Sequence, residues 1–176
     1  MQPIDCRRPS RRAAVTLAAS FALGLALPAE AAPSRKLFVI GRSKNKNVVH
    51  YDVKLTKSGT LNLEDPIDAY WVMRAEDGRR EELTFLEVRL AYGFSIESKV
   101  SEGGFLIRLA ACDRRLAVRN IADQHQAELS IAGEQAILKR IFVQATDDAV
   151  VPRVVHVDVQ GTSIASGKAL RERLRP

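Results

Sequence analysis

Short runs in which apolar and polar residues alternate recur along the chain from residue 35 onward. Clusters of Gly, Asn, Asp and Ser separate these runs, and alternation with a period of two is typical of strands that bury one face. The pattern therefore predicts a mainly β domain. The predicted strands are 36–40, 48–55, 66–74, 94–100, 104–112, 116–121, 126–131, 136–146 and 153–160.

The first two predicted strands have the clearest hairpin signal. Residues 36–40 are apolar on both faces, which is typical of a buried strand. In the second strand Val49, Tyr51 and Val53 alternate with polar positions. Between the two strands, the sequence Asn45-Lys46-Asn47 indicates a tight turn, because Asn tolerates the positive φ of hairpin turns.

Two segments predict helices. Residues 81–92 have leucines at helical spacing, with Glu81 and Glu82 at the expected N-terminal end and Gly93 as a C-cap. The Arg-rich residues 168–174 predict a short terminal helix. Residues 136–146 fit a helix or a strand, and the β-rich setting favours a strand. We therefore expect an antiparallel β barrel or sandwich of about eight strands, with one inserted helix and a short C-terminal helix.

The first 31 residues have the three regions of an export signal in their usual order. Four arginines precede the apolar stretch 13–27, and Ala29-Glu30-Ala31 forms a small-x-small cleavage pattern. We expect residues 1–31 to be a signal peptide that is removed, leaving one domain, 32–176, in the periplasm or secreted, with no transmembrane anchor. The Ser10-Arg11-Arg12 sequence also suggests the twin-arginine route, and Sec export stays open.

Removal of the signal changes the charge and the cysteine count. The full chain of 176 residues has a formal net charge of +6 and two cysteines. Residues 1–31 hold four Arg, one Asp and one Glu, so 23 basic and 19 acidic residues remain, a net charge of +4. Cys112 remains as a single thiol, for which we expect burial and no internal disulfide. This weak basic bias, together with export, argues against nucleic acid as a partner.

Two strands carry the same His-x-Asp pattern, His50 with Asp52 and His156 with Asp158. The period of two places both side chains of each pair on one face of their strand. If the strands were neighbours, two imidazoles and two carboxylates could bind a divalent metal. Alternatively, these residues form the solvent-facing side of two amphipathic strands.

Basic, amide and aromatic side chains gather in the first hairpin and in the window 51–92, which holds the only Trp and every Tyr. Tyr and Trp suit half-apolar pockets because the ring is buried while its polar atom takes a partner. They also suit an ordinary core, and surface charge is ordinarily solvated. The candidate ligand-binding residues are Arg42, Ser43, Asn45, Asn47, Tyr51, Tyr70, Trp71 and Tyr92.

Two motifs near the C-terminus fall short of known cofactor or nucleophile sites. Residues 161–165 are similar to a nucleophile elbow, but the last His of the chain, His156, precedes the serine instead of following it. Residues 161–168 are similar to a phosphate loop, but the glycine spacing is one residue too long and Ala169 replaces the hydroxyl residue. We therefore expect no cofactor.

Three segments, 37–52, 66–72 and 91–93, resemble a bacterial family described as domain of unknown function 4833 (DUF4833). Its distinctive parts are the Arg-Ser-x-Asn-x-Asn block that begins at Arg42 and the strand with Tyr70 and Trp71. The resemblance covers about residues 37–159. It implies a single exported β-rich domain and names no ligand.

These observations predict a non-enzymatic, exported module that binds an unidentified small molecule or a component of the cell envelope. The alternative is a small metal-dependent hydrolase that uses the two His-x-Asp strands. A separation of the two imidazoles beyond about 10 Å would exclude a shared metal.

Overall fold

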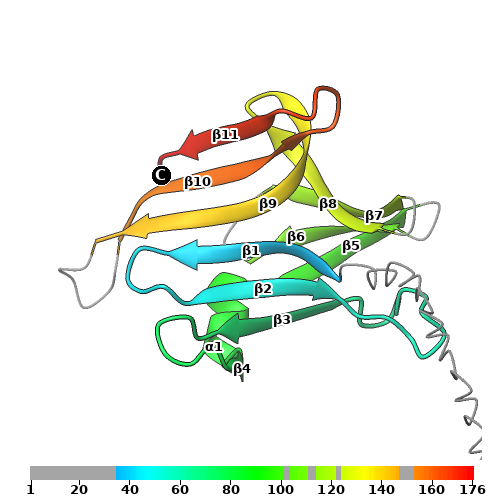
Figure 1. The fold of residues 1–176 in the computed structure, drawn as a ribbon, viewed down its shortest axis with the longest axis horizontal. Helices are drawn as coiled ribbons and strands as arrows, with labels where there is room; N and C mark the ends of the chain where they lie inside the picture. The colour runs from blue at the N-terminus through cyan, green and yellow to red at the C-terminus, as the bar shows by residue number, and fades with distance from the viewer. Residues whose placement is uncertain (1–34, 101–103, 111–113, 122–123, 147–152) are drawn as a thin grey trace, which may run out of the picture. The chain divides into compact units, whose positions relative to one another are not determined.

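A computed structural model describes residues 35–100, 104–110, 114–121, 124–146 and 153–176. These residues form one mixed sheet of eleven strands, curled into a half barrel (Figure 1), with one short helical segment. The predicted signal peptide, Cys112 and the turns at 101–103, 113 and 123 lie outside the described residues. The strands are β1 (Lys36–Arg42), β2 (Val48–Val53), β3 (Ile67–Val72), β4 (Arg80–Glu82), β5 (Phe94–Val100), β6 (Gly104–Leu109), β7 (Arg115–Ile121), β8 (Gln124–Ile131), β9 (Glu134–Ala145), β10 (Val154–Ser163) and β11 (Ala169–Leu174).

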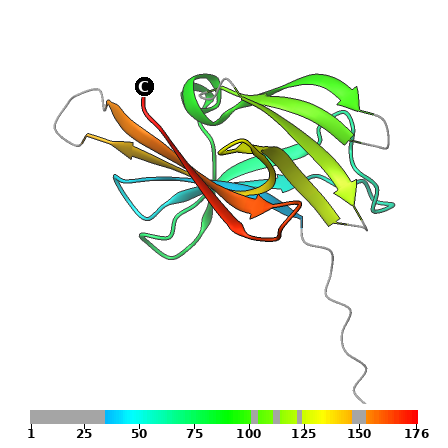
Figure 2. The same cartoon turned by 90° about the horizontal axis from the view of Figure 1, so that it is seen from above.

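The long strand β9 joins all parts of the sheet. Its first residues pair with β8, and its residues 140–143 pair with β1. β10 pairs along the length of β9, and β11 continues the sheet from β10. Two branches, β4-β3-β2-β1 and β5-β6-β7-β8, therefore both attach to β9, and Figure 2 shows them diverging.

The expected architecture is right in class and wrong in detail. The domain is mainly β, but it has eleven described strands instead of about eight, and they form one curled sheet instead of a closed barrel or a sandwich. β1 and β9 run parallel, with Val39 opposite Arg140, so the sheet is mixed and not purely antiparallel. This pairing joins segments far apart in the sequence, which local alternation does not report.

The predicted β1–β2 hairpin is confirmed, with Gly41 opposite Val48. Its turn does not use an asparagine with positive φ, because Ala132 is the one non-glycine residue with positive φ among those described. Instead, the side chain of Asn45 accepts a hydrogen bond from the backbone N–H of Asn47 (3.2 Å), as in an Asx turn.

One core lies on the inner face of the sheet and draws on both branches. In β2, Val49, Tyr51 and Val53 are buried, as their alternation predicts. The rings of Phe38 and Tyr51 stack with their centroids 4.4 Å apart. Across from them lie buried apolar residues of the second branch, among them Phe105 and Leu116.

The predicted helix 81–92 begins later than expected. Residues 80–82 form β4 beside β3, and the helical segment consists of α1 (Phe85–Glu87) and the π-helical turn η1 (Val88–Tyr92). Thr84 and Glu87 form a capping box. Gly93 ends η1, as predicted, by donating its N–H to the Val88 carbonyl (2.9 Å), and a Cβ on Gly93 would lie only 2.1 Å from that oxygen.

The predicted C-terminal helix is wrong, because residues 169–174 form the strand β11. Leu170 and Leu174, four residues apart, suit a helix and equally suit one face of a strand. The ladder to β10 decides between them, since it places Asp158 opposite Arg173. Asp158 accepts hydrogen bonds from Arg171 (2.6 Å) and Arg173 (2.8 Å), which only an extended β11 places on the same face.

The carboxylates that hold β11 make the domain acid-sensitive. Hydrogen bonds from Arg173 and Arg171 hold the pKa of Asp158 well below its usual value, and those from Arg114 and the Ala132 N–H lower the pKa of Glu172 to about 2. A lowered pKa contributes stability above the unfolded-state pKa, and this contribution is lost as the pH falls.

We therefore expect the contribution of Asp158 and Glu172 to the urea midpoint of unfolding to be constant from pH 7 to about pH 5 and to be lost between about pH 4.5 and 2. Glu172→Gln should lower the midpoint at pH 7 and flatten this decline. Glu134→Gln is the control, because Glu134 makes no ion pair with any described residue. Equal acid profiles for the two variants would contradict the assignment.

Candidate functional site

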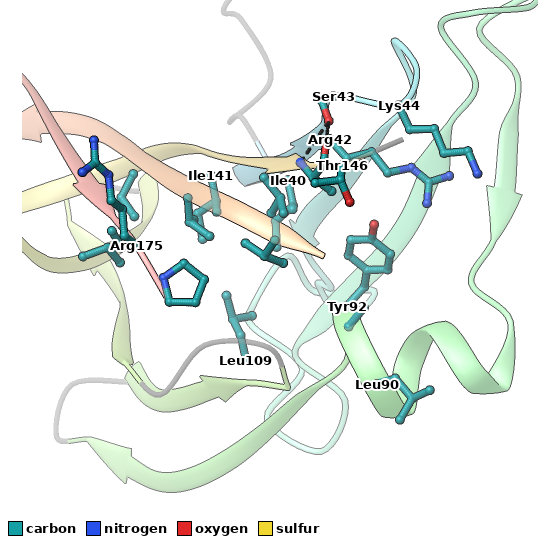
Figure 3. A pocket seen from close by; sticks show the side chains of 18 of the residues that line it. Ile40, Arg42, Ser43, Lys44, Leu90, Tyr92, Leu109, Ile141, Thr146 and Arg175 are labelled. Atoms are coloured by element: carbon teal, nitrogen blue, oxygen red, sulfur yellow. Dashed lines mark hydrogen bonds between the residues drawn. The ribbon is translucent and has the colours of Figure 1, made fainter. Parts of the chain in front are cut away.

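A cleft of about 910 Å³ opens on the inner face of the sheet (Figure 3). Strands β1, β9, β10 and β11 form one side, and η1 with the end of β6 forms the other. Its volume lies within the range of small-molecule sites. The lining is mainly apolar and includes Ile40, Ile141, Val157, Val159, Leu174 and Leu109.

Basic residues lie at the two ends of this apolar surface. Arg42 and Lys44 lie at one end, and Arg175 lies at the other (Figure 3). Arg114 also lines the cleft and is held by a bidentate ion pair with Glu172. None of the described lining residues has an acidic side chain, and neither Lys44 nor Arg175 makes an ion pair with a described residue. The cleft therefore has a positive charge at each end.

Three of the predicted ligand residues meet beside the cleft. The guanidinium of Arg42 lies over the Trp71 ring, 4.9 Å from its centroid, and Trp71 packs edge-on against Tyr92 at 5.1 Å. Arg42 and Tyr92 line the cleft, whereas Trp71 is buried behind them. Burial raises the pKa of the Tyr92 hydroxyl, and the positive charge of Arg42 limits the rise. The first hairpin and the window 51–92 thus contribute one side of the cleft.

Glu87 holds Trp71, and with it this side of the cleft, in place. It accepts a hydrogen bond from the Trp71 indole N–H (3.1 Å) and one from the Thr84 backbone N–H (2.9 Å). Burial alone would raise the pKa of Glu87, but these hydrogen bonds and the nearby charge of Arg42 outweigh it and lower the pKa. Glu87 is therefore ionised at neutral pH and is fully occupied in holding α1 against β3.

Tyr51 belongs to the core instead of the cleft. It has no exposed surface, and its hydroxyl donates a 2.6 Å hydrogen bond to the Tyr92 carbonyl at the end of η1. Burial raises the pKa of Tyr51 far above its usual value. The residue acts on the cleft indirectly, because it ties η1 to β2.

The candidate residues of the first hairpin divide between the cleft and the turn. Ser43 lines the cleft, and its hydroxyl exchanges hydrogen bonds with the backbone of Ala145. The side chain of Asn47 is buried and holds Ala75 and Met73. Asn45 and Asn47 line a separate shallow depression of about 330 Å³ on the hairpin. Both asparagines therefore shape the turns.

Tyr70 points to the opposite face of β3 from Trp71, as the period of two requires. There its hydroxyl donates a 2.8 Å hydrogen bond to Asp52, and Arg80 lies over its ring at 3.9 Å. Burial and this hydrogen bond raise the pKa of Tyr70 to about 12. His50 packs against the Tyr70 ring. Burial, aided by the charge of Lys36, lowers the pKa of His50. The Tyr70 side chain is thus separated from the cleft by the sheet.

The structure does not bring the two His-x-Asp pairs together. His50 and Asp52 lie on β2 and His156 and Asp158 on β10, with β1 and β9 between these strands. Three strand spacings correspond to about 14 Å, beyond the reach of one metal ion. The described residues contain no group of three metal-ligating side chains. The alternative of a solvent-facing side holds only in part, since His50 is 9% and Asp158 2% exposed, whereas Asp52 and His156 are half-buried.

Most of the apolar lining comes from the C-terminal strands, which sequence reasoning did not connect with a site. Val155, Val157 and Val159 alternate and were expected on one face. A bulge between Val154 and His156 turns Val155 outward and Val154 into the cleft. The alternation of β10 indicates that one of its faces is apolar, but the sequence does not show which segments lie opposite that face.

The comparison with family models identifies the chain. The model described as Domain of unknown function (DUF4833) matches residues 38–173. The chain belongs to this family. The match confirms the resemblance carried by residues 37–52, 66–72 and 91–93, and it extends into β11. Comparison with curated proteins and with solved structures gave no match. The geometry of this DUF4833 domain is therefore the main basis for a functional proposal.

Proposed function

We propose that the domain is an exported binding module for an elongated apolar molecule with an anionic group, such as a long-chain fatty acid. The observation that carries this proposal is the cleft of about 910 Å³, with apolar walls, basic ends and no acidic side chain among the described lining residues. Apolar walls favour a hydrocarbon body, and the basic ends favour a carboxylate or phosphate.

The end formed by Arg42 and Lys44 is the better anion site. Arg114, another residue of the cleft lining, already binds Glu172 through both terminal nitrogens of its guanidinium. Lys44 is exposed at the rim and makes no ion pair with a described residue, so an anion there does not compete with a protein carboxylate. No observation in the described residues favours the alternative of a metal-dependent hydrolase.

A fluorescent polyunsaturated fatty acid tests the proposal when it is titrated into the purified protein. We expect saturable binding, and Lys44→Glu should weaken it about tenfold, because the reversed charge repels the carboxylate. Lys46→Glu is the matched control, since Lys46 lies on the same hairpin outside the cleft. It should change the affinity less than about twofold. The methyl ester of the same fatty acid should bind both variants alike.

Absence of saturable binding would reject the proposal. Equal weakening by Lys44→Glu and Lys46→Glu would reject the cleft as the site, because it would indicate only general attraction to a basic surface.

A further inference from the structure

The helical segment beside the cleft exposes an unusual set of apolar side chains. Phe85 is 74%, Leu86 64% and Leu90 68% exposed, and Val88 is 44% exposed. Of the ten large hydrophobic residues exposed in the described chain, these four fall within six consecutive residues. A concentration of this kind indicates a surface that meets a partner.

Polar contacts at both ends, and the packing of Tyr92 against Trp71, hold this segment in place. The capping box of Thr84 and Glu87, the Trp71 indole and the Tyr51 hydroxyl fix its two ends, and α1 and η1 bury none of their own residues. The exposed apolar side chains are therefore presented on a supported segment. They contribute little to the core, so their presence needs another explanation.

Two basic side chains at the segment, Arg89 and Lys44, make no ion pair with a described residue. Arg89 is exposed between Val88 and Leu90, and Lys44 lies at the same end of the cleft. The acidic neighbour Glu87 is occupied by Thr84 and Trp71. The carboxylates around β4 share the two arginines Arg79 and Arg80; they are Asp68, Glu76, Asp77, Glu81 and Glu82. Exposed apolar side chains, with Arg89 among them and Lys44 at the cleft that they adjoin, suit the interface of a bilayer that contains anionic lipid.

The exposed segment is continuous with the cleft. Leu90 is largely exposed and also lines the cleft, and Figure 3 shows it on the same side as Arg42, Lys44 and Tyr92. We infer that α1 and η1 dock the domain on an anionic bilayer, so that an amphiphile passes from the bilayer into the cleft. This inference rests on the proposed function for the ligand and on the exposed segment for the docking.

Cosedimentation of the purified protein with lipid vesicles tests the docking. Vesicles of phosphatidylcholine with phosphatidylglycerol should bind the protein more tightly than vesicles of phosphatidylcholine alone, and added salt should weaken the difference. The variant Phe85→Ser/Leu86→Ser should lower vesicle binding at least tenfold, because it removes the two exposed apolar side chains that would enter the bilayer interface. Fatty-acid binding should be unchanged, since neither side chain lines the cleft. Val155→Ser/Ile164→Ser is the matched control, with similarly exposed apolar residues (47% and 49%) on another surface.

The two proposals fail in different ways. Loss of vesicle binding by Phe85→Ser/Leu86→Ser, with fatty-acid binding in vesicle-free solution unchanged, supports the docking. Failure of the unaltered protein to bind anionic vesicles, or equal loss in both double variants, overturns it, whatever the fatty-acid titration shows. The docking would also be overturned if the unaltered protein sedimented as a dimer, the Phe85→Ser/Leu86→Ser variant sedimented as a monomer, and both bound vesicles equally. A second copy of the chain would then be what covers the segment.

Discussion

Replacing Tyr51 with alanine is expected to lower the free energy of unfolding by about 4 kcal/mol. Tyr51 is fully buried, stacks on Phe38 and holds the Tyr92 carbonyl. Alanine removes the ring, leaves a cavity in the first branch of the sheet and leaves that carbonyl without its donor. Urea denaturation followed by circular dichroism measures the change.

Tyr51→Phe separates the two contributions. It keeps the stack on Phe38 and loses only the hydrogen bond, which corresponds to about 1 kcal/mol. We also expect Tyr51→Phe to weaken fatty-acid binding, because the end of η1 is less firmly tied to β2. A loss below about 1 kcal/mol for Tyr51→Ala would contradict the central place of this residue in the core.

Gly161→Ala is the second large effect, a loss of about 3 kcal/mol. A Cβ on Gly161 would lie 2.5 Å from the carbonyl oxygen of Ile137 and 2.7 Å from the Cδ1 atom of Ile131. The first of these is backbone of the adjacent strand β9, so relief requires separation of β9 and β10. The bulge between Gln160 and Gly161 brings the two strands into this close approach.

Gly41→Ala is the control, because Gly41 also lies in a strand. Its added Cβ would meet side chains and no backbone: the flexible end of Arg140 at 3.3 Å, Val48 at 3.5 Å and Phe142 at 3.7 Å. We expect a change within about 0.5 kcal/mol, since a residue other than glycine also lowers the entropy of the unfolded chain. Thermal unfolding of both variants checks the contrast. Similar losses of stability at the two positions would show that the close approach of β9 and β10 is not the reason why position 161 requires glycine.

Alternation predicted the strands well because it reports burial on one face, which is a local property. Residues 94–100 were predicted as a strand, and β5 has those bounds. The strand β4 was missed because Arg80–Glu82 carries no apolar alternation, and its cross-strand contact is made by charge, between Arg80 and Asp68. β11 was predicted as a helix because the ion pairs of Asp158 with Arg171 and Arg173 join residues more than a dozen positions apart.

The candidate site was predicted in part for the same reason. Arg42, Trp71 and Tyr92 come together because β1, β2 and β3 are consecutive antiparallel strands and η1 follows them closely in the chain. Tyr70 could have been excluded from the sequence alone, since it adjoins Trp71 in an alternating strand and must face the other way. The apolar side of the cleft could not be predicted, because it depends on which strands β9 and β10 join.

The parallel pairing of β1 with β9 also sets the order in which the domain can fold. Val39 pairs with His50 within the hairpin, but it gains its parallel partner on β9 only when residue 140 is available, so the contact order of the second pairing is high. Folding slows when long loops must close before their contacts form. A chain emerging from its N-terminus can form the β1–β2–β3 meander early, but the edge of β1 and the inner face with Phe38 stay uncovered until β9 arrives. Until then the nascent domain presents an unpaired apolar edge, which makes this interval its period of greatest aggregation risk.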